Sequence, residues 1–251
     1  MFKDRTPDYN LIYKTANGVN LPLQIFLPDG GVKDARTVLC IHGGGWNSCA
    51  VTDNSPWDGG WMGNNAKYFA EKGFIGIAIS YRCLTISDEL NVGDLLEDCK
   101  DAIRYIREHF DFVNFDDIVY AGDSAGGYLA TMLGLTQDDD IRPDTVVSLN
   151  PVIELPGRWG YAFNNCSDID ALVPKKNIGQ KCAKFIFMHG NADTVVEMEH
   201  TKELHEMLLA RSHSSEFVEI DGAMHAFVLF GYKYPDEYVT DIMEQIIDKL
   251  A

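Results

Sequence analysis

Residues 120–127, Tyr-Ala-Gly-Asp-Ser-Ala-Gly-Gly, constrain the fold of this chain more than any other part of its sequence. The run 117–121 before them predicts a short strand, and the apolar run 128–133 after them predicts the start of a helix. Between the two, Gly122-Asp-Ser-Ala-Gly126 fits G-x-S-x-G, a sharp strand-to-helix turn. The serine needs small neighbours, because a side chain there would collide with the adjoining strand or helix. The turn aims Ser124 at a helix N-terminus that favours an oxyanion, and it predicts a nucleophile.

A glycine-rich loop upstream predicts where such an oxyanion would bind. The apolar run 37–41, an expected strand, leads directly into His42-Gly-Gly-Gly-Trp46. Consecutive glycines cost backbone entropy, so we expect them to expose backbone N–H groups to a ligand. This loop type is the known oxyanion partner of the serine turn. Gly44 and Gly45, together with the N–H of Ala125, are the predicted donors, and His42 is expected to hold the loop in place.

Together these motifs resemble those of the α/β-hydrolase fold. The resemblance is closest to the small esterases related to hormone-sensitive lipase and to the carbohydrate esterases that remove acetyl or feruloyl groups from plant polysaccharides. It covers nearly the whole chain, from the first hairpin to the last helix. It implies a mostly parallel central sheet with helices on both faces, and a triad whose members follow in the order Ser, Asp or Glu, His.

The residues themselves indicate an acid and a base. Two apolar runs, each an expected strand, lead into polar loops, of which the first carries Asp193 and the second carries His225. Open α/β sheets place their sites at such carboxyl ends of strands. Asp193 and His225 are therefore the predicted acid and base. Asp221 remains an alternative acid, and His189 is a competing base that precedes Asp193 and so has the wrong order.

The combination predicts hydrolysis of a carboxylic ester through an acyl-enzyme, with no metal and no organic cofactor. Aromatic side chains that could contact a substrate are Trp46, Trp57, Trp61 and Trp159. Flat aromatic faces suit a sugar ring, although the same tryptophans could simply pack the loop. An acetyl or feruloyl ester of a carbohydrate is the leading expectation, and a small aryl or alkyl ester is the close rival.

Two other classes of protein compete with an esterase. The first is an amide hydrolase on the same fold, such as an arylformamidase, whose family shows a related H-G-G-x-W loop. The second is a binding or scaffold protein that inherited the fold without the activity. A retained nucleophile, base, acid and oxyanion loop argues against the second class.

Length and alternation predict one α/β-hydrolase domain over residues 1–251. A hairpin at 9–14 and 20–27 is followed by strands that alternate with helices, and this order indicates a mostly parallel sheet. The proline-containing stretch 150–183 is expected to be a short cap-like insertion.

Charge and hydropathy exclude several partners. The formal net charge of -17 argues against binding to nucleic acid or to anionic membranes, and no segment approaches a membrane span. A small-molecule or oligosaccharide ester is the expected partner, and the sequence indicates no oligomeric state. The N-terminus lacks the apolar run of a signal peptide, so a cytoplasmic location is expected, although removal of a signal peptide would leave the same pattern.

Overall fold

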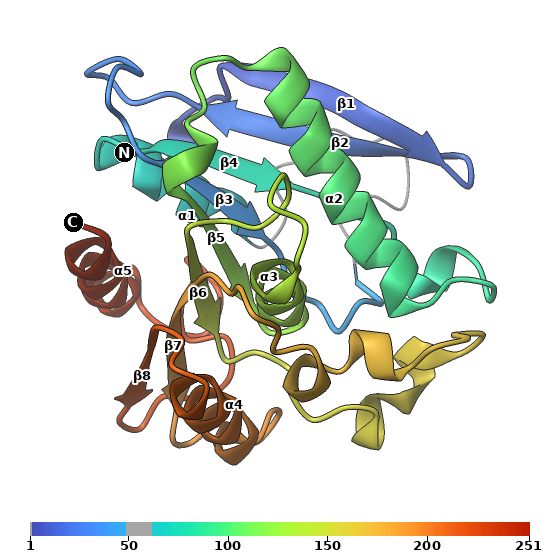
Figure 1. Cartoon of the computed structure of the whole chain (residues 1–251). Coiled ribbons are helices and arrows are strands. Elements are labelled where there is room, and N and C mark those ends of the chain that lie inside the picture. The colour runs from blue at the N-terminus through green and yellow to red at the C-terminus, as the bar shows by residue number, and fades with distance from the viewer. Residues whose placement is uncertain (1, 49–61) are drawn as a thin grey trace.

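An eight-stranded sheet forms the centre of the structure, a computed structural model that describes residues 2–48 and 62–251. The strand order is β1-β2-β4-β3-β5-β6-β7-β8 (Figure 1). The strands are β1 (Tyr9–Ala16), β2 (Val19–Phe26), β3 (Thr37–Ile41), β4 (Ile75–Ile79), β5 (Ile118–Asp123), β6 (Thr145–Leu149), β7 (Lys184–Gly190) and β8 (Ser215–Ile220). The pairs β1–β2 and β2–β4 are antiparallel, and the pairs from β4 through β8 are parallel. The predicted α/β fold with a mostly parallel sheet is confirmed.

Helices cover both faces of this sheet (Figure 1). They are α1 (Gly63–Glu71), α2 (Val92–His109), α3 (Ala125–Leu135), α4 (Met198–Ala210) and α5 (Asp236–Leu250). Apolar side chains of α2, α3 and α4 belong to one core, and those of α1 and α5 belong to a second core on the opposite face. Strand residues alternate between the two, as Leu39 and Cys40 of β3 illustrate. Burial on both faces explains why the strands read as continuous apolar runs.

Side-chain caps explain where some elements begin. Helix α2 begins at Val92, because the Asn91 side chain accepts a hydrogen bond from Gly93 N at 2.9 Å. In return, the Asp94 carboxylate accepts one from Asn91 N at 2.9 Å, which completes a capping box.

The segment 150–183 joins β6 to β7 without an α-helix or a strand. It forms the 3-10 helices Gly157–Phe163, Asp170–Leu172 and Pro174–Lys176. Within the first of them, the Tyr161 hydroxyl donates to Gly45 O at 2.9 Å. The segment therefore touches the glycine-rich loop after β3.

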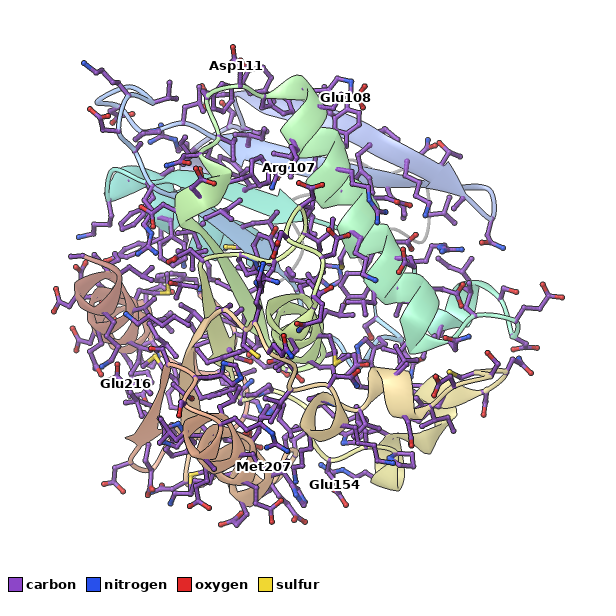
Figure 2. The ribbon with its side chains drawn as sticks, in the orientation of Figure 1. Arg107, Glu108, Asp111, Glu154, Met207 and Glu216 are labelled. Atoms are coloured by element: carbon purple, nitrogen blue, oxygen red, sulfur yellow. The ribbon has the colours of Figure 1, made fainter. Side chains whose placement is uncertain are left out.

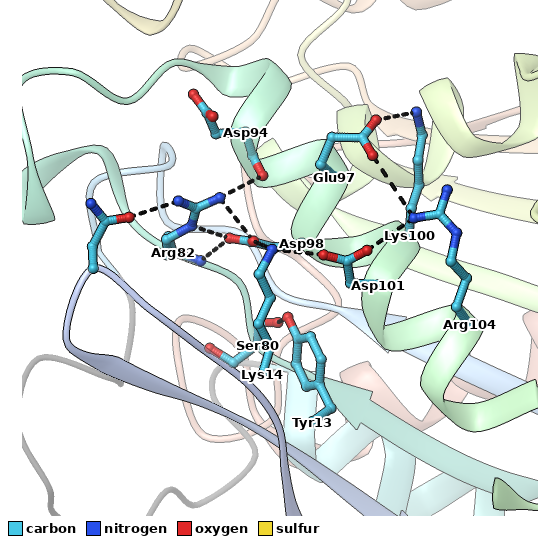
Figure 3. A network of polar contacts seen from close by, with 11 residues as sticks. Tyr13, Lys14, Ser80, Arg82, Asp94, Glu97, Asp98, Lys100, Asp101 and Arg104 are labelled. Atoms are coloured by element: carbon cyan, nitrogen blue, oxygen red, sulfur yellow. Dashed lines mark hydrogen bonds and ion pairs between the residues drawn. The ribbon is translucent and has the colours of Figure 1, made fainter. Parts of the chain in front are cut away.

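A buried carboxylate fastens the first hairpin to α2 (Figure 3). Asp98 of α2 is fully buried, and its Oδ2 accepts from Arg82 Nε at 2.7 Å and from Arg82 N at 3.1 Å. Its Oδ1 accepts from Lys14 Nζ of β1 at 2.6 Å. Lys14 also reaches Asp101 at 2.7 Å, one helical turn further along α2. A buried charge is tolerated when it is paired in this way.

The surface carries the excess of acidic side chains. Figure 2 shows Glu108 and Asp111 pointing outward at one end of α2, and both are exposed. Within residues 2–48 and 62–251, the helices are too short or too polar to cross a bilayer.

We predict that Asp98→Asn lowers the free energy of unfolding by about 3–5 kcal/mol, because it leaves the largely buried Arg82 without its counter-charge. Urea unfolding followed by tryptophan fluorescence measures the change. Asp101→Asn is the matched control, since the Asp101 side chain is 37% exposed and its loss should cost no more than about 1 kcal/mol. Equal losses in the two variants would contradict the role given to Asp98.

Candidate active site

Ser124 occupies the turn between β5 and α3 in a strained backbone conformation. Its φ is 54° and its ψ is -116°, in a region that residues with a Cβ rarely adopt. Its N–H donates to Leu149 O of the neighbouring β6 at 2.9 Å. A Cβ on Gly122 would lie 2.2 Å from Gly126 O, and one on Gly126 would lie 2.1 Å from Ile41 O. Backbone packing alone therefore requires both glycines of the motif.

The loop after β8 brings His225 to this serine. His225 Nε2 lies 2.8 Å from Ser124 Oγ, and Nδ1 lies 2.7 Å from Asp193 Oδ2. With the ring proton on Nδ1, the imidazole donates to Asp193 and accepts from the serine hydroxyl. The three predicted residues thus form one continuous chain of hydrogen bonds.

Asp193 is held as an anion by several donors. Its side chain is buried, and Oδ1 accepts from the N–H groups of Val195 and Val196 at 2.8 and 3.0 Å. His189 Nε2 lies 3.3 Å from Oδ2. Burial acts to raise the pKa of Asp193, but the hydrogen bonds from His189, His225 and Val196 outweigh it and hold the pKa well below its usual range.

The structure separates the alternatives that the sequence left open. Asp221 accepts a hydrogen bond from the Asn191 side chain at 3.0 Å, so Asp193 and not Asp221 meets His225. His189 is fully buried, and its Nε2 lies 3.1 Å from Val196 O and 3.3 Å from Asp193 Oδ2, while its Nδ1 contacts the Thr201 hydroxyl, so none of these contacts involves the serine. His189 therefore helps to hold the Asp193 carboxylate in place.

The glycine-rich loop lies directly against the serine turn. A Cβ on Gly43 would come within 2.8 Å of Asp123 O. Gly44 and Gly45 have φ values of 108° and 61°, which favour glycine. Within residues 2–48 and 62–251, the N–H groups of Gly44, Gly45 and Ala125 have no hydrogen-bond acceptor. All three are thus available to a ligand.

His42 packs beneath this loop. Its ring is buried, stacks on Tyr81 with centroids 4.3 Å apart, and places Nδ1 2.8 Å from Gly43 O. Burial lowers the pKa of His42 to about 4, so the ring is neutral near pH 7. These contacts match a residue that orients the loop.

A cavity of about 260 Å³ opens over the serine. It is lined by Gly44, Gly45, Asp123, Ser124, Trp159, Val195, His225, Ala226, Tyr232 and Lys233. Trp159 thus lines the cavity, and its contact with a substrate stays a prediction. Lys233 Nζ donates to His225 O at 3.1 Å and so holds the backbone of the loop that carries His225.

The other three tryptophans that were predicted to contact a substrate have different outcomes: one is buried, and two lie outside the described residues. Trp46 is fully buried, with its ring edge-on to Tyr128 and Trp159 at 5.3 and 5.9 Å. This corrects the expectation that Trp46 contacts a substrate, because its ring supports Trp159 from inside. Trp57 and Trp61 lie outside the described residues.

A possible metal-ligand group lies elsewhere. Glu154, Glu197 and His200 place ligand atoms within 4.8 Å of one another. Lys175 Nζ lies 3.4 Å from His200 Nδ1, and its charge would oppose a bound cation. None of the four residues lines the cavity over Ser124.

Sequence reasoning missed several supporting residues. They are Lys233, which donates to His225 O, Tyr161, which donates to Gly45 O, and Asn150, whose side chain donates to Asp123 at 2.7 Å. The sequence indicates His189 only as a competing base, and its contact with Asp193 was not expected. Tyr161 and Asn150 act through contacts between distant parts of the chain, and no local motif signals such a contact. His189 and Lys233 lie four and eight residues from their partners, but neither spacing belongs to a known motif.

This sheet, with a serine, a histidine and an aspartate meeting at its carboxyl edge, defines the class of α/β hydrolases. Residues 23–154, more than half of the chain, match the BD-FAE family model, and the chain belongs to this family.

Solved structures and curated sequences agree with this assignment. The apo form of Thermogutta terrifontis esterase 2 superposes with a TM-score of 0.80 at 26% identity, covering 96% of this chain and 92% of that one. The carboxylesterase/phospholipase LipF of Mycobacterium tuberculosis is 33% identical over 147 residues, which are 58% of this chain and 35% of LipF. Esterase LipC of the same organism is 25% identical over 234 residues, 80% of this chain and 55% of LipC. The chain thus spans between about a third and about half of the length of the mycobacterial esterases it matches.

We predict that Asp193 makes stability depend on pH at the acid end. Because its folded pKa is depressed, its contribution is fully present above the unfolded value of about 3.9 and is lost as the pH falls through the folded value. The unfolding free energies of wild type and Asp193→Asn should therefore converge as the pH falls from about 4 towards 2. Urea unfolding across this range measures the difference, with Asp221→Asn as the control for removing a carboxylate from the same sheet edge. A constant difference would contradict the anionic state of Asp193.

Proposed function

We propose that this protein is a serine esterase that hydrolyses short-chain carboxylic esters through a Ser124–His225–Asp193 triad. The observation that carries the proposal is the hydrogen-bonded chain from Ser124 Oγ through His225 to Asp193, with distances of 2.8 and 2.7 Å. A serine hydroxyl is a weak nucleophile until a neighbouring base removes its proton.

The first half of the reaction forms an acyl-enzyme. Ser124 Oγ attacks the ester carbonyl carbon while its proton passes to His225 Nε2. Asp193 keeps the imidazole in the productive tautomer and stabilises the imidazolium that forms. His225 then gives the proton to the oxygen of the departing alcohol. Water, deprotonated by the same imidazole, attacks the acyl carbon and releases the acid.

The N–H groups of Gly44, Gly45 and Ala125 would stabilise the charge that develops on the carbonyl oxygen. A donor of this kind typically contributes about 3–4 kcal/mol to lowering the barrier. Their lack of acceptors among the described residues means that they need not break existing hydrogen bonds to do so.

We further propose that the acyl group is short and that the alcohol is a carbohydrate. The cavity of about 260 Å³ is small, and structures of Thermogutta terrifontis esterase 2 have been solved with propionate and with butyrate bound. The indole of Trp159 offers a flat face on which a sugar ring could stack. A small aryl or alkyl ester is the rival substrate, and an N-formyl amide is a second one on the same machinery.

We predict that Ser124→Ala reduces hydrolysis of p-nitrophenyl acetate to background, a loss of about 10⁶-fold in kcat. The variant should keep its circular dichroism spectrum and lose covalent labelling by a fluorophosphonate probe. Ser87→Ala, which removes a hydroxyl that accepts a hydrogen bond from the Glu89 N–H, is the matched control. It should keep both the hydrolysis of p-nitrophenyl acetate and the labelling by the probe. Retention of more than a few per cent of activity in a clean Ser124→Ala preparation would remove this serine from the mechanism.

We predict that an acetylated xylo-oligosaccharide is turned over with a higher kcat/KM than N-formylkynurenine. Trp159→Leu should raise KM for the oligosaccharide about fivefold, the value of one aromatic contact, and change KM for p-nitrophenyl acetate less. Steady-state kinetics on the three substrates give the ranking. Preferred turnover of N-formylkynurenine would favour the amide hydrolase, and equal effects of Trp159→Leu on both esters would contradict the sugar contact.

A further inference from the structure

One buried amide lies between the serine turn and the base loop. Asn150 directly follows β6 and is fully buried. Its Nδ2 donates to Asp123 Oδ1 at 2.7 Å and to Leu149 O at 2.8 Å, and its Oδ1 accepts from Ala226 N at 3.1 Å. Its backbone N–H donates to Met188 O of β7 at 2.8 Å. Because acceptors face Nδ2 and a donor faces Oδ1, the amide has one favoured orientation.

The partners of this amide are the chain neighbours of the reacting groups. Asp123 immediately precedes Ser124, and Ala226 immediately follows His225. The Ser124 N–H in turn donates to Leu149 O, which also accepts from Asn150 Nδ2. Asn150 therefore links the side chain of the residue before Ser124 to the backbone N–H of the residue after His225.

Three residues at or next to these contacts have a strained backbone conformation. Ser124, Asn150 and Ala226 have φ values of 54°, 36° and 61°, all in the left-handed region. Each such residue costs about 1–3 kcal/mol and persists only where its surroundings over-determine it. The hydrogen bonds of Asn150 constrain Asn150 and Ala226 directly, and they reach Ser124 only through its neighbour Asp123 and through Leu149 O.

We propose that Asn150 is a positioning residue, which fixes the base loop against the serine turn and keeps His225 Nε2 within hydrogen-bonding reach of Ser124. The proposal rests on the esterase function proposed above. A purely space-filling role would need a side chain of this volume but not its donor and acceptor.

The charge of Asp123 explains why an amide suits this position. Burial raises the pKa of Asp123 to about 6, while His225, the Asn150 hydrogen bond and Lys233 lower it and Asp193 raises it. An amide donates to this carboxylate at every pH. A carboxyl group in its place could donate only while protonated, and it would repel Asp123 once both were ionised.

The test compares Asn150→Leu, which keeps the volume and loses the bridge, with Asn150→Asp. Asn177 supplies controls for the loss of a bridging amide, because its Nδ2 donates to Asp170 O and Val173 O, both at 2.8 Å and away from the cavity. Its φ is -107°, so it does not reproduce the strain at Asn150, and Asn150→Asp serves as the variant that also tolerates a positive φ. Asn150→Leu should lower kcat on p-nitrophenyl acetate about 10²-fold, the effect of a misplacement of roughly 1 Å, with a much smaller change in KM. Asn177→Leu and Asn177→Asp should stay close to wild type.

The pH dependence of kcat distinguishes a positioning role of Asn150 from a purely stabilising one. For Asn150→Asp, the ratio of its kcat to that of wild type should fall as the pH rises from about 5 to 8, since the new carboxyl group loses its proton. A folded Asn150→Leu variant with kcat within about threefold of wild type, well short of the loss expected from misplacement, would overturn the proposal. If Asn150→Leu does not fold, a flat Asn150→Asp ratio would overturn it.

A further measurement does not depend on ester hydrolysis. The proton between His225 Nδ1 and Asp193 should give a downfield NMR resonance in wild type and in Asn177→Leu, and Asn150→Leu should broaden or lose it. An unchanged resonance would contradict positioning. A wild-type chain that hydrolyses no ester but shows the predicted NMR difference would refute the esterase proposal alone.

Discussion

The close approach of backbone to backbone at the serine turn is the constraint on which the site depends. Strand β3 lies beside β5 in register, with Ile41 opposite Gly122, so the glycine-rich loop and the serine turn leave the sheet at the same level. A Cβ at Gly126 would meet Ile41 O at 2.1 Å, which shows how little space separates the two segments. This proximity brings the N–H groups of Gly44, Gly45 and Ala125 close to Ser124. The same backbone contact thus sets both the strain of the nucleophile and the place where an oxyanion would bind.

Parallel pairing extends this arrangement across the sheet. Asp123 pairs with Leu149 on β6, Leu149 pairs with Met188 on β7, and Gly190 pairs with Ile220 on β8. Because these strands end at one edge, the loops that follow them deliver Asp193 and His225 to the same place. The order Ser124, Asp193, His225 along the chain therefore follows from the order of the strands that precede them. On the proposal above, the hydrogen bonds of Asn150 then fix the distance between the first and the last of these residues.

Local patterns predicted the parts of the fold that depend on local chemistry. The serine turn, the glycine loop and the alternating strands could be read from the sequence because small residues and apolar runs are required at fixed spacings there. Asn150 could not be identified, since its partner Ala226 N is 76 residues away and an asparagine after a strand is common in any loop. The Trp46 prediction failed for a related reason. A loop tryptophan has the same sequence signature whether its ring faces a ligand or, as here, packs on Tyr128.

Two carboxylates beside the same imidazole differ in pKa because they differ in their donors. Asp193 accepts from two backbone N–H groups and is contacted by two histidines, which together outweigh its burial. Asp123 accepts one side-chain hydrogen bond among the described residues, from Asn150, and burial prevails, which raises its pKa. Only the first is therefore held firmly as an anion, next to the ring nitrogen where positive charge would develop. With a pKa of about 6, Asp123 becomes protonated only below neutral pH, and its charge close to Ser124 would oppose the formation of an oxyanion above that value. Among the described residues, only Asp193 also forms a hydrogen bond with His225 Nδ1, so the contact with the base and the surrounding donors together favour Asp193 as the acid.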